Sequence, residues 1–460
     1  MSKPTAVNKN TCVTFKKQPL AGFTIVELLV IIIVIAILAT IVVVSYNGVT
    51  ARATETALKS DLMSAASLVE SERGFSGNYP ADAASADYGR GLKAGDGRIL
   101  MYVKKTDGYC MSIKPSTTSS PSFKVTNGDN TIVPGTCEPT VITLAGSGTA
   151  GPADGAGTAA QFNKPDGVAV DSSGVVYVAD ENNHRIRKIT PAGVVSTLAG
   201  SGTAGNTNGT GTAAQFSYPR GVAVDASGTV YVADMGNQRI RKITAAGVVT
   251  TLAGSSSGYV DATGTSARFN TPQGVGVDSS GNVYVADSIN RRIRKITAAG
   301  VVTTLAGSGA AGFADGTGTA AQFNTPWGLG VDSSGVVYVA DTINNRIRKI
   351  TAAGVVTTLA GSGAAGPADG TGTAAQFNNP SGVAVDSSGN VYVADWSNHN
   401  IRKITPSGAV TTLAGSGVSG FADEPGTAAK FSSPWSVAVD SSGSIYVADS
   451  VNNRIRKITP

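Results

Sequence analysis

The chain has 460 residues, of which 41% are hydrophobic, 15% are charged and 57 are glycine. Its 36 basic and 31 acidic residues give a net charge of +5, but four of the lysines lie within the first 17 residues. Without those four, the excess of positive charge falls to one, so the charge balance gives no reason to expect a nucleic-acid partner.

The N-terminal region combines a basic leader with a long apolar run. Residues 1–22 contain four lysines and no acid, and an almost unbroken apolar run extends from Phe23 to Val44. A helix over 23–45 would span roughly 34 Å, which is enough for one membrane crossing. A secretory signal peptide would have its cleavage site after the apolar run, whereas here a Gly22-Phe23 junction precedes it and Glu27 follows four residues later.

This arrangement resembles the class III signal of type IV pilins and pseudopilins. The resemblance implies that residues 1–22 are a leader, that prepilin peptidase cuts after Gly22, and that the new terminus at Phe23 is methylated. It also implies that 23–50 crosses the inner membrane once before assembly, and that it then contacts other pilin subunits, with Glu27 neutralising a terminal amine in the filament. The alternative is an ordinary signal-anchor helix with a glutamate near its edge.

Residues 51–139 are expected to form a small α+β head of the pilin type. Residues 51–72 are polar but periodic, which indicates that the helix continues beyond the apolar run. The apolar side of this helix would contain Ala57, Leu58, Leu62, Ala65, Leu68 and Val69. The candidate strands are Ile99–Val103, Tyr109–Ile113 and Phe123–Thr126.

Two of the three cysteines form a candidate disulfide. Cys12 lies in the leader and would leave with it, so Cys110 and Cys137 remain as an even pair, consistent with an oxidising exterior. A bridge closing about 28 residues would stabilise the head by roughly 3–4 kcal/mol. Two free buried thiols are the alternative.

From residue 140 to the end, the chain repeats a block of about 54 residues six times. The aspartates that end the motif Val-Tyr-Val-Ala-Asp lie 54, 53, 54, 54 and 54 residues apart, at Asp180, Asp234, Asp287, Asp341, Asp395 and Asp449. In the first copy the predicted strands are Gly167–Asp171, Val175–Asp180, Arg185–Thr190 and Val194–Gly200. A period of this length, built from short strands and glycine turns, predicts blades arranged around an axis.

The last copy lacks its fourth strand, and the missing strand precedes the first copy. The pattern Thr-Leu-Ala-Gly ends the fourth strand elsewhere, and it occurs at 143–146 within Thr140–Gly146. This segment should complete the sixth blade and remove the open edge of the ring. We therefore predict a long N-terminal helix with a pilin-like head, followed by an all-β six-bladed propeller over 140–460 that its own first strand closes.

The repeated core resembles the NHL family of β-propellers. The resemblance rests on Pro-x-Gly-Val-Ala-Val-Asp, Val-Tyr-Val-Ala-Asp and Asn-x-Arg-Ile-Arg-Lys-Ile. Each copy carries an additional loop between blades, such as 147–161. The family implies a binding platform more often than an enzyme.

Several local patterns in the propeller have ordinary structural explanations. Glycine patterns such as that at Gly146 recur between blades without a following helix, so no nucleotide cofactor is expected. The Asp-Gly turns at Asp154, Asp315 and Asp369 lack the acid density of a calcium loop, so no metal is expected there. The repeated Arg-Ile-Arg-Lys run is expected to form ion pairs between blades, such as Asp180 with Arg185.

The positions at which the copies differ are the best indication of function. All three tryptophans and both histidines of the chain occupy variable slots that are expected to lie on one face of the propeller. Blade five also has an asparagine where the other copies have arginine. The predicted contact zone is Trp327, Trp396, His399, Asn400 and Trp435. The alternative is that these tryptophans cover the core or vary neutrally.

These features predict an interaction protein rather than an enzyme. The expected function is that of a minor pilin at the filament tip, whose extracellular propeller binds a surface protein or a glycan as an adhesin. One alternative is a pseudopilin of a secretion system. The other is a metal-dependent lyase or lactonase, but two histidines and the variable acids of blade one offer too few converging ligands.

Overall fold

A computed structural model describes residues 56–71, 98–105, 108–115, 123–126, 129–134 and 138–459. The chain divides into two compact units, Met1–Cys137 and Glu138–Pro460. The predicted leader, the processing residues Gly22 and Phe23, and the predicted span 23–50 with Glu27 lie outside the described residues. None of the helices in the described ranges is long and apolar enough to cross a membrane.

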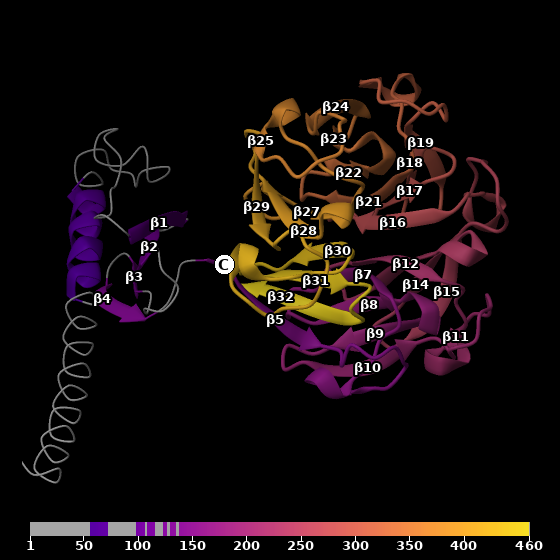
Figure 1. The fold of residues 1–460 in the computed structure, drawn as a ribbon. Helices are drawn as coiled ribbons and strands as arrows, with labels where there is room; N and C mark the ends of the chain where they lie inside the picture. The colour runs from indigo at the N-terminus through magenta and orange to yellow at the C-terminus, as the bar shows by residue number, and fades with distance from the viewer. Residues whose placement is uncertain are drawn as a thin grey trace, which may run out of the picture. The chain divides into compact units, whose positions relative to one another are not determined.

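The N-terminal unit contains a helix at residues 56–71 and a four-stranded antiparallel sheet (Figure 1). The strands follow the chain as β1 (Arg98–Lys105), β2 (Gly108–Pro115), β3 (Phe123–Thr126) and β4 (Asp129–Pro134). The sequence did not predict β4.

The helix packs on this sheet through its apolar side. Leu58, Leu62 and Val69 are fully buried and form one cluster with sheet residues that include Met111 and Val125. The predicted periodicity is therefore correct, except at Leu68, which is 42% exposed. This part of the chain is an α+β unit. Of the predicted long helix, only residues 56–71 lie within the described part.

The second unit is a six-bladed β-propeller, as predicted (Figure 1). Blades one to three consist of β7 (Pro165–Val170), β8 (Val176–Asp180), β9 (Arg185–Ile189) and β10 (Val194–Ala199); β12 (Pro219–Val224), β13 (Val230–Asp234), β14 (Arg239–Ile243) and β15 (Val248–Ala253); and β16 (Pro272–Val277), β17 (Val283–Asp287), β18 (Arg292–Ile296) and β19 (Val302–Ala306). Blades four to six consist of β21 (Pro326–Val331), β22 (Val337–Asp341), β23 (Arg346–Ile350) and β24 (Val355–Ala360); β26 (Pro380–Val385), β27 (Val391–Asp395), β28 (Asn400–Ile404) and β29 (Ala409–Ala414); and β30 (Pro434–Val439), β31 (Ile445–Asp449), β32 (Arg454–Thr459) and β5 (Thr140–Ala145).

Short elements in the additional loops extend four of the blades. The two-residue strands β6 (Gly155–Ala156), β11 (Gly209–Thr210), β20 (Gly316–Thr317) and β25 (Gly370–Thr371) pair with the fourth strand of blades one, two, four and five. Single 3₁₀ turns precede the first strand of each blade, at η1 (Gly157–Ala159), η3 (Gly211–Ala213), η5 (Gly264–Ser266), η6 (Gly318–Ala320), η8 (Gly372–Ala374) and η10 (Gly426–Ala428). Others follow the second strand, at η2 (Glu181–Asn183), η4 (Met235–Asn237), η7 (Thr342–Asn344) and η9 (Trp396–Asn398).

The ring closes as the sequence predicts. Strand β5 pairs antiparallel with β32, with Thr140 opposite Thr459 and Val141 opposite Ile458. The blade-six sheet therefore has the order β30-β31-β32-β5, which places the first and last strands of the propeller side by side (Figure 1). Because β5 pairs with β32, the last blade does not end in an unpaired edge at this position.

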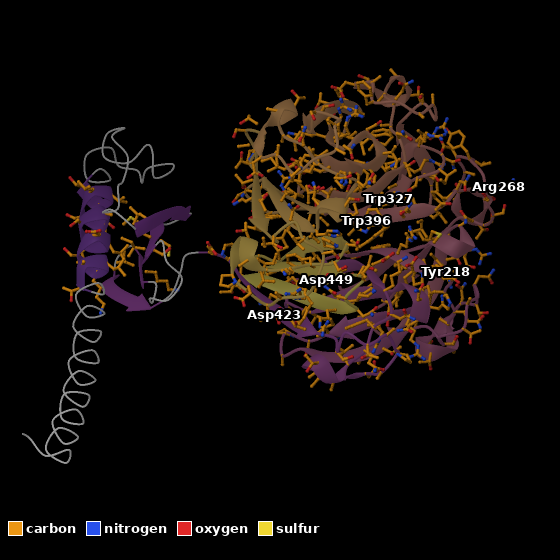
Figure 2. The ribbon with its side chains drawn as sticks, viewed as in Figure 1. Tyr218, Arg268, Trp327, Trp396, Asp423 and Asp449 are labelled. Carbon is orange, nitrogen blue, oxygen red and sulfur yellow. The ribbon has the colours of Figure 1, made fainter. Side chains whose placement is uncertain are left out.

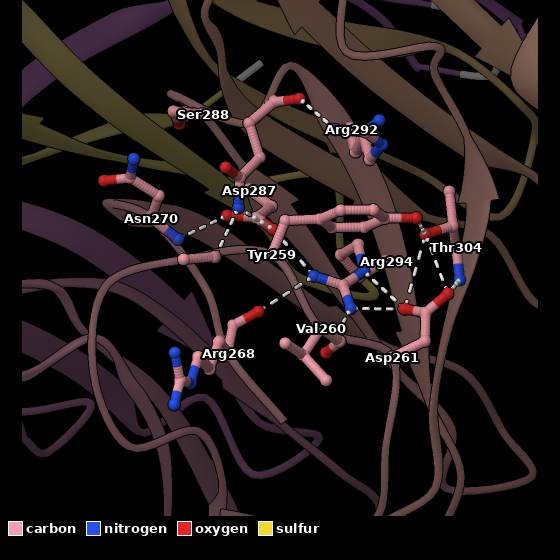
Figure 3. Close-up of polar contacts among 12 residues, drawn as sticks. Tyr259, Val260, Asp261, Arg268, Asn270, Asp287, Ser288, Arg292, Arg294 and Thr304 are labelled. Atoms are coloured by element: carbon pink, nitrogen blue, oxygen red, sulfur yellow. Dashed lines mark hydrogen bonds and ion pairs between the residues drawn. The ribbon is translucent and has the colours of Figure 1, made fainter. Parts of the chain in front are cut away.

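Each blade contains a fully buried arginine, shown for blade three in Figure 3. Arg294 lies 2.7 Å from the Asp287 carboxylate, donates to the carbonyl of Arg268 at 3.2 Å, and also pairs with Asp261. Its guanidinium lies 5.2 Å from the centre of the Phe269 ring. A buried charge is tolerated when it is paired and hydrogen-bonded. Arg294 is paired with two carboxylates and donates to a carbonyl, so its burial is compensated.

The predicted ion pair between Asp180 and Arg185 is wrong. Asp180 pairs instead with Arg187 of the same blade, at 2.7 Å, while Arg185 donates to the carbonyls of Pro152 and Ser201. Alternation along the strand places Arg185 and Arg187 on the same face, and of the two it is Arg187 that is fully buried beside the buried Asp180 carboxylate. The Asp-Gly turns have a related role, since Asp154 binds the same Arg187 at 2.6 Å.

Candidate functional site

The first strand of each blade lines the central channel. These strands pack against one another in a closed ring, and residues from all six enclose a cavity of about 60 Å³. Glycine permits this close approach: a Cβ at Gly167, Gly221, Gly274 or Gly328 would collide with the backbone carbonyl of the next blade. The residue just before this glycine position lies at the channel mouth and varies from blade to blade.

The variable slots lie at one end of the blades, as predicted. In the strand register of blade one, Pro165 lies opposite Asp180 and Asp180 lies opposite Arg185, so the start of the first strand and the turn after the second strand are neighbours. The slot after this proline contains Asp166, Arg220, Gln273, Trp327, Ser381 and Trp435 in blades one to six.

The three tryptophans of the chain form one cluster, which we call the Trp cluster. The rings of Trp327 and Trp435 are stacked, with centroids 4.7 Å apart and planes 22° apart. Trp396, from η9, lies edge-on to both, at 5.8 Å from Trp327 and 5.9 Å from Trp435. Trp327 and Trp396 lie close together near the middle of the ring in Figure 2. All three side chains are only half-buried, and Trp327 Nε1 is buried without a hydrogen-bond partner.

The opposite side of the mouth is charged, and we call it the polar cluster. Glu181 binds Lys164 at 2.8 Å and Arg220 at 2.9 Å, and Arg220 also donates to Gln273 at 2.8 Å. The guanidinium of Arg220 lies 5.0 Å from the centre of the Trp435 ring, so a cation–π contact joins the two clusters. The channel mouth therefore presents aromatic faces beside groups that can form hydrogen bonds.

Two carboxyl groups in the polar cluster have pKa values shifted in opposite directions. Complete burial, followed by the charge of Glu181, raises the pKa of Asp166 to about 8. Burial also disfavours the charged form of Glu181, but Arg220 and Lys164 outweigh that effect and lower its pKa. Burial thus favours the protonated form of Asp166, and Ser450 donates a hydrogen bond to its Oδ1 at 3.1 Å. Shifted carboxyl groups of this kind are frequent at functional sites.

His399 connects two blades, whereas the sequence predicted that it would contact a ligand. Its Nδ1 accepts a hydrogen bond from the backbone N–H of Ser433 in blade six, at 3.1 Å. His184 makes the equivalent contact with Tyr218 at 3.1 Å, and Asn453 Oδ1 does so with Lys164 at 2.9 Å. This slot therefore carries a connection between blades.

Asn400 also lies apart from the Trp cluster. It begins β28 and lines a separate hollow together with Asn398, Ser416 and Gly417. The residues of the predicted contact zone therefore do not form one site. The three tryptophans meet at the channel mouth, His399 connects two blades, and Asn400 lines a separate hollow.

The polar cluster lies outside the predicted contact zone. Its members Asp166, Arg220, Gln273 and Glu181 occupy the same variable slots as the tryptophans, and this shared position is the sequence signal that identifies them. Lys164 lies just before the proline that begins each blade, and only its contact with Glu181 identifies it.

The predicted disulfide lies partly in the described residues. Cys110 in β2 is buried and disulfide-bonded, whereas Cys137 lies outside the described part, so the pairing of the two stays a prediction. Within the described ranges, no group of three or more His, Cys, Asp or Glu side chains is placed to hold a metal ion.

The repeats match known protein families. The NHL repeat profile matches residues 162–189, 269–296, 323–350, 377–404 and 431–458, and the profile of the teneurin NHL domain matches 201–265. The propeller of this chain is therefore built from NHL repeats.

Curated relatives are similar to somewhat more than half of this chain. NHL repeat-containing protein 2 of Bos taurus is 32% identical over an alignment of 289 residues that covers 54% of this chain and 40% of the relative. Protein SUPPRESSOR OF QUENCHING 1, chloroplastic, of Arabidopsis thaliana is 30% identical over an alignment of 285 residues that covers 57% of this chain and 27% of the relative. The chain spans less than half the length of these relatives.

Solved structures share the fold. A protein of unknown function from Bacteroides thetaiotaomicron has a TM-score of 0.55 at 20% identity, covering 78% of this chain and 87% of its own. An auxiliary nutrient binding protein from Bacteroides ovatus has a TM-score of 0.54 at 17% identity, covering 78% and 88%. At these identities the likeness concerns the fold alone.

Proposed function

We propose that this chain is a binding protein whose NHL propeller takes its ligand at the mouth of the central channel. The observation that carries the proposal is the Trp cluster. Blades four to six bring Trp327, Trp396 and Trp435 together in contact, although nothing in the repeated frame requires tryptophan at these slots. Half-exposed tryptophans are frequent anchors at binding surfaces, because they combine a large apolar face with a polar N–H group.

The size and chemistry of the mouth indicate how a ligand would bind. The cavity of about 60 Å³ is far smaller than a typical small-molecule pocket of roughly 300–1,000 Å³, so a ligand would lie across the mouth. Trp327 Nε1 lacks an acceptor, and the polar cluster offers charged groups beside the aromatic rings. A glycan residue or an exposed loop of a protein, each with both apolar and hydrogen-bonding faces, fits this combination.

The N-terminal sequence features support display of this platform at a cell surface. The basic leader, the Gly22-Phe23 junction and Glu27 support a minor type IV pilin that displays the propeller as an adhesin. A head of this size would crowd a helical array of thin subunits, which favours the filament tip. A pseudopilin of a secretion system would share these features and differ in its assembly machinery.

An enzyme is the second candidate, and one observation favours it. Asp166 and Glu181 form a carboxyl pair with pKa values shifted apart, as acid and base catalysts have. However, Asp166 is fully buried, and Glu181 is held by Lys164 and Arg220. Neither carboxyl is presented to a substrate in this arrangement, so we favour binding. Lyase and lactonase assays with Glu181→Gln as the control would detect a catalytic role.

The test of the proposed function is a screen of the purified chain on glycan and protein arrays. Trp327→Gln is the matched control, because blade three carries glutamine in the same slot. We expect ligands that the wild type retains and the variant loses. Ligands retained equally by both proteins would show that binding does not occur at the Trp cluster.

A further inference from the structure

Five of the six blades begin their third strand with arginine, and the guanidinium lies across the neighbouring loop. In blade three, Arg292 donates to the carbonyl of Ser308 at 2.7 Å and to that of Asn290 at 3.0 Å. In blade four, Arg346 makes the same two contacts, with Ser362 at 2.9 Å and Asn344 at 3.2 Å. The propeller thus contains a repeated receptor for a guanidinium group, formed by two backbone carbonyls.

Blade five has no arginine at the start of its third strand, so no guanidinium occupies the corresponding position. Asn400 replaces the arginine, and a hollow of about 600 Å³ lies beside it. Its lining includes Asn398 and Ser416, which correspond to the two residues whose carbonyls receive the guanidinium in blades three, four and six. A Cβ built on Gly309 or Gly363 would meet the guanidinium at 2.5 or 2.6 Å, whereas at Gly417 the nearest atom is the Asn398 carbonyl oxygen, at 3.8 Å.

Asn400 itself provides an independent indication of a ligand. Its side chain lines the hollow and is only 3% exposed, yet its Oδ1 has no hydrogen-bond partner. A buried acceptor without a donor costs roughly 1–3 kcal/mol, so a ligand that donates to it would gain that energy. The site therefore holds an unused acceptor in addition to the two backbone carbonyls of the repeated receptor.

The hollow also lacks the aromatic cover found in other blades. Tyr259, visible beside Arg292 in Figure 3, lies 3.8 Å from that guanidinium, and Phe313 lies 4.2 Å from Arg346. The corresponding residue of blade five is Pro367, which lines the hollow. A small ring in place of a large one leaves more room for a group that enters from outside.

We propose that the hollow of blade five binds a guanidinium group supplied by another molecule. The acceptors are neutral carbonyl and amide oxygens, and they suit the planar fork of a guanidinium because the same pair of carbonyls already holds one in blades three, four and six. The same chemistry can come from the side chain of an arginine on a partner protein or from a small guanidinium compound. This site is separate from the channel mouth, so a result against ligand binding at the mouth would leave this proposal unchanged.

The test uses the full chain, purified in detergent, and ligand-observed NMR. The probes are N-acetyl-arginine-methylamide and its citrulline counterpart, which has a similar shape but no charge. We expect saturable binding of the arginine probe and at least a tenfold weaker response to citrulline. Equal binding of the two probes would overturn the proposal.

Two variants assign any binding to this hollow. Asn400→Arg restores the residue of the other five blades, so it should fill the hollow, abolish probe binding and leave the melting temperature equal or higher. Arg185→Asn should create a second site, because blade one carries Pro152 where blade five carries Pro367; we expect twice the number of bound probes. Undiminished binding by Asn400→Arg would overturn the assignment.

A further comparison identifies the source of the guanidinium. A set of surface peptides, each with one central arginine, is titrated beside free L-arginine. Peptides that bind at least tenfold more tightly than L-arginine would indicate a protein partner, and the reverse order would indicate a small guanidinium compound. Failure of every arginine-containing probe to bind would overturn the proposal.

Discussion

At the scale of single residues, the propeller depends on a buried charge in every blade. Arg187 and its five counterparts are fully buried, and each contacts the aspartate that ends the second strand. Burial raises the pKa of these aspartates, to about 6 for Asp395, although hydrogen bonds and the neighbouring arginine oppose the shift. Each buried arginine therefore needs its aspartate, and each aspartate needs its arginine, because either charge alone would be buried without a partner.

Removing one partner of such a pair should destabilise the whole propeller. In blade two, Arg241→Ala should lower the free energy of unfolding by about 3–5 kcal/mol, because it leaves the Asp234 carboxylate buried without its partner. The control is Arg239→Ala, which removes a half-buried arginine whose contact with the Asn206 carbonyl measures 3.5 Å. Chemical denaturation measures both variants, and equal losses would contradict the special role of the buried pair.

The raised pKa of Asp166 predicts a pH dependence of stability. Its pKa is about 8 in the folded chain against an ordinary 3.8, so folding favours the protonated form. The stabilisation is complete below the ordinary pKa and is lost as the pH rises towards 8. Compared with wild type, Asp166→Asn should therefore show a smaller fall in melting temperature between pH 5 and pH 9. Parallel curves for the two proteins would show that Asp166 is already ionised at neutral pH.

At the scale of elements, strand β5 holds the ring together. It forms a ladder with β32, and its Val141 belongs to a buried cluster that joins blades five and six. The loop of blade six is tied to the same segment, since the Gly426 N–H donates to the Pro139 carbonyl at 2.7 Å.

Deleting residues 140–146 should therefore unfold the propeller or cause it to aggregate. The deletion removes the fourth strand of blade six and exposes the edge of β32 to pairing with other chains. Thermal melting and size-exclusion chromatography measure the effect. A monomeric product with the melting temperature of the wild type would contradict the closure.

The repeat made the elements predictable, and distances across the ring explain most of what the sequence missed. Alternating Val, Tyr and Ile placed β7 to β10 within about two residues of their observed ends, because the period of two is local. The slot argument placed Trp327 and Trp435 on one face. Their stacking at 4.7 Å depends on how closely the first strands pack around the axis, which no local pattern encodes. The hollow beside Asn400 likewise could not be predicted from the sequence, because it is recognised only when blade five is superposed in mind on the blades where Arg292 or Arg346 fills the same position.

At the scale of the whole molecule, two compact units with different architectures share one chain. The first contains a helix on a four-stranded sheet, and the second is a closed ring of NHL repeats. We propose, from the resemblance of the N-terminal sequence to type IV pilins, that the first unit belongs to an anchor and the second to a displayed binding head.

The anchor hypothesis predicts where the mature chain begins. Because the basic leader, the Gly22-Phe23 junction and Glu27 occur together, N-terminal sequencing of surface material should start at Phe23. Mass spectrometry should detect a methyl group on that terminus. An intact Met1, or cleavage after the apolar run, would contradict the pilin assignment.

The most direct test of the account is cell adhesion with Trp396→Ser. Blades three and six carry serine in this slot, at Ser288 and Ser450, so the frame tolerates the change. Loss of an anchor tryptophan typically costs about 2 kcal/mol or more, which is roughly a thirtyfold loss of affinity. We expect adhesion to fall by about this factor while the melting temperature changes little. Adhesion equal to that of the wild type would contradict a binding role for the Trp cluster.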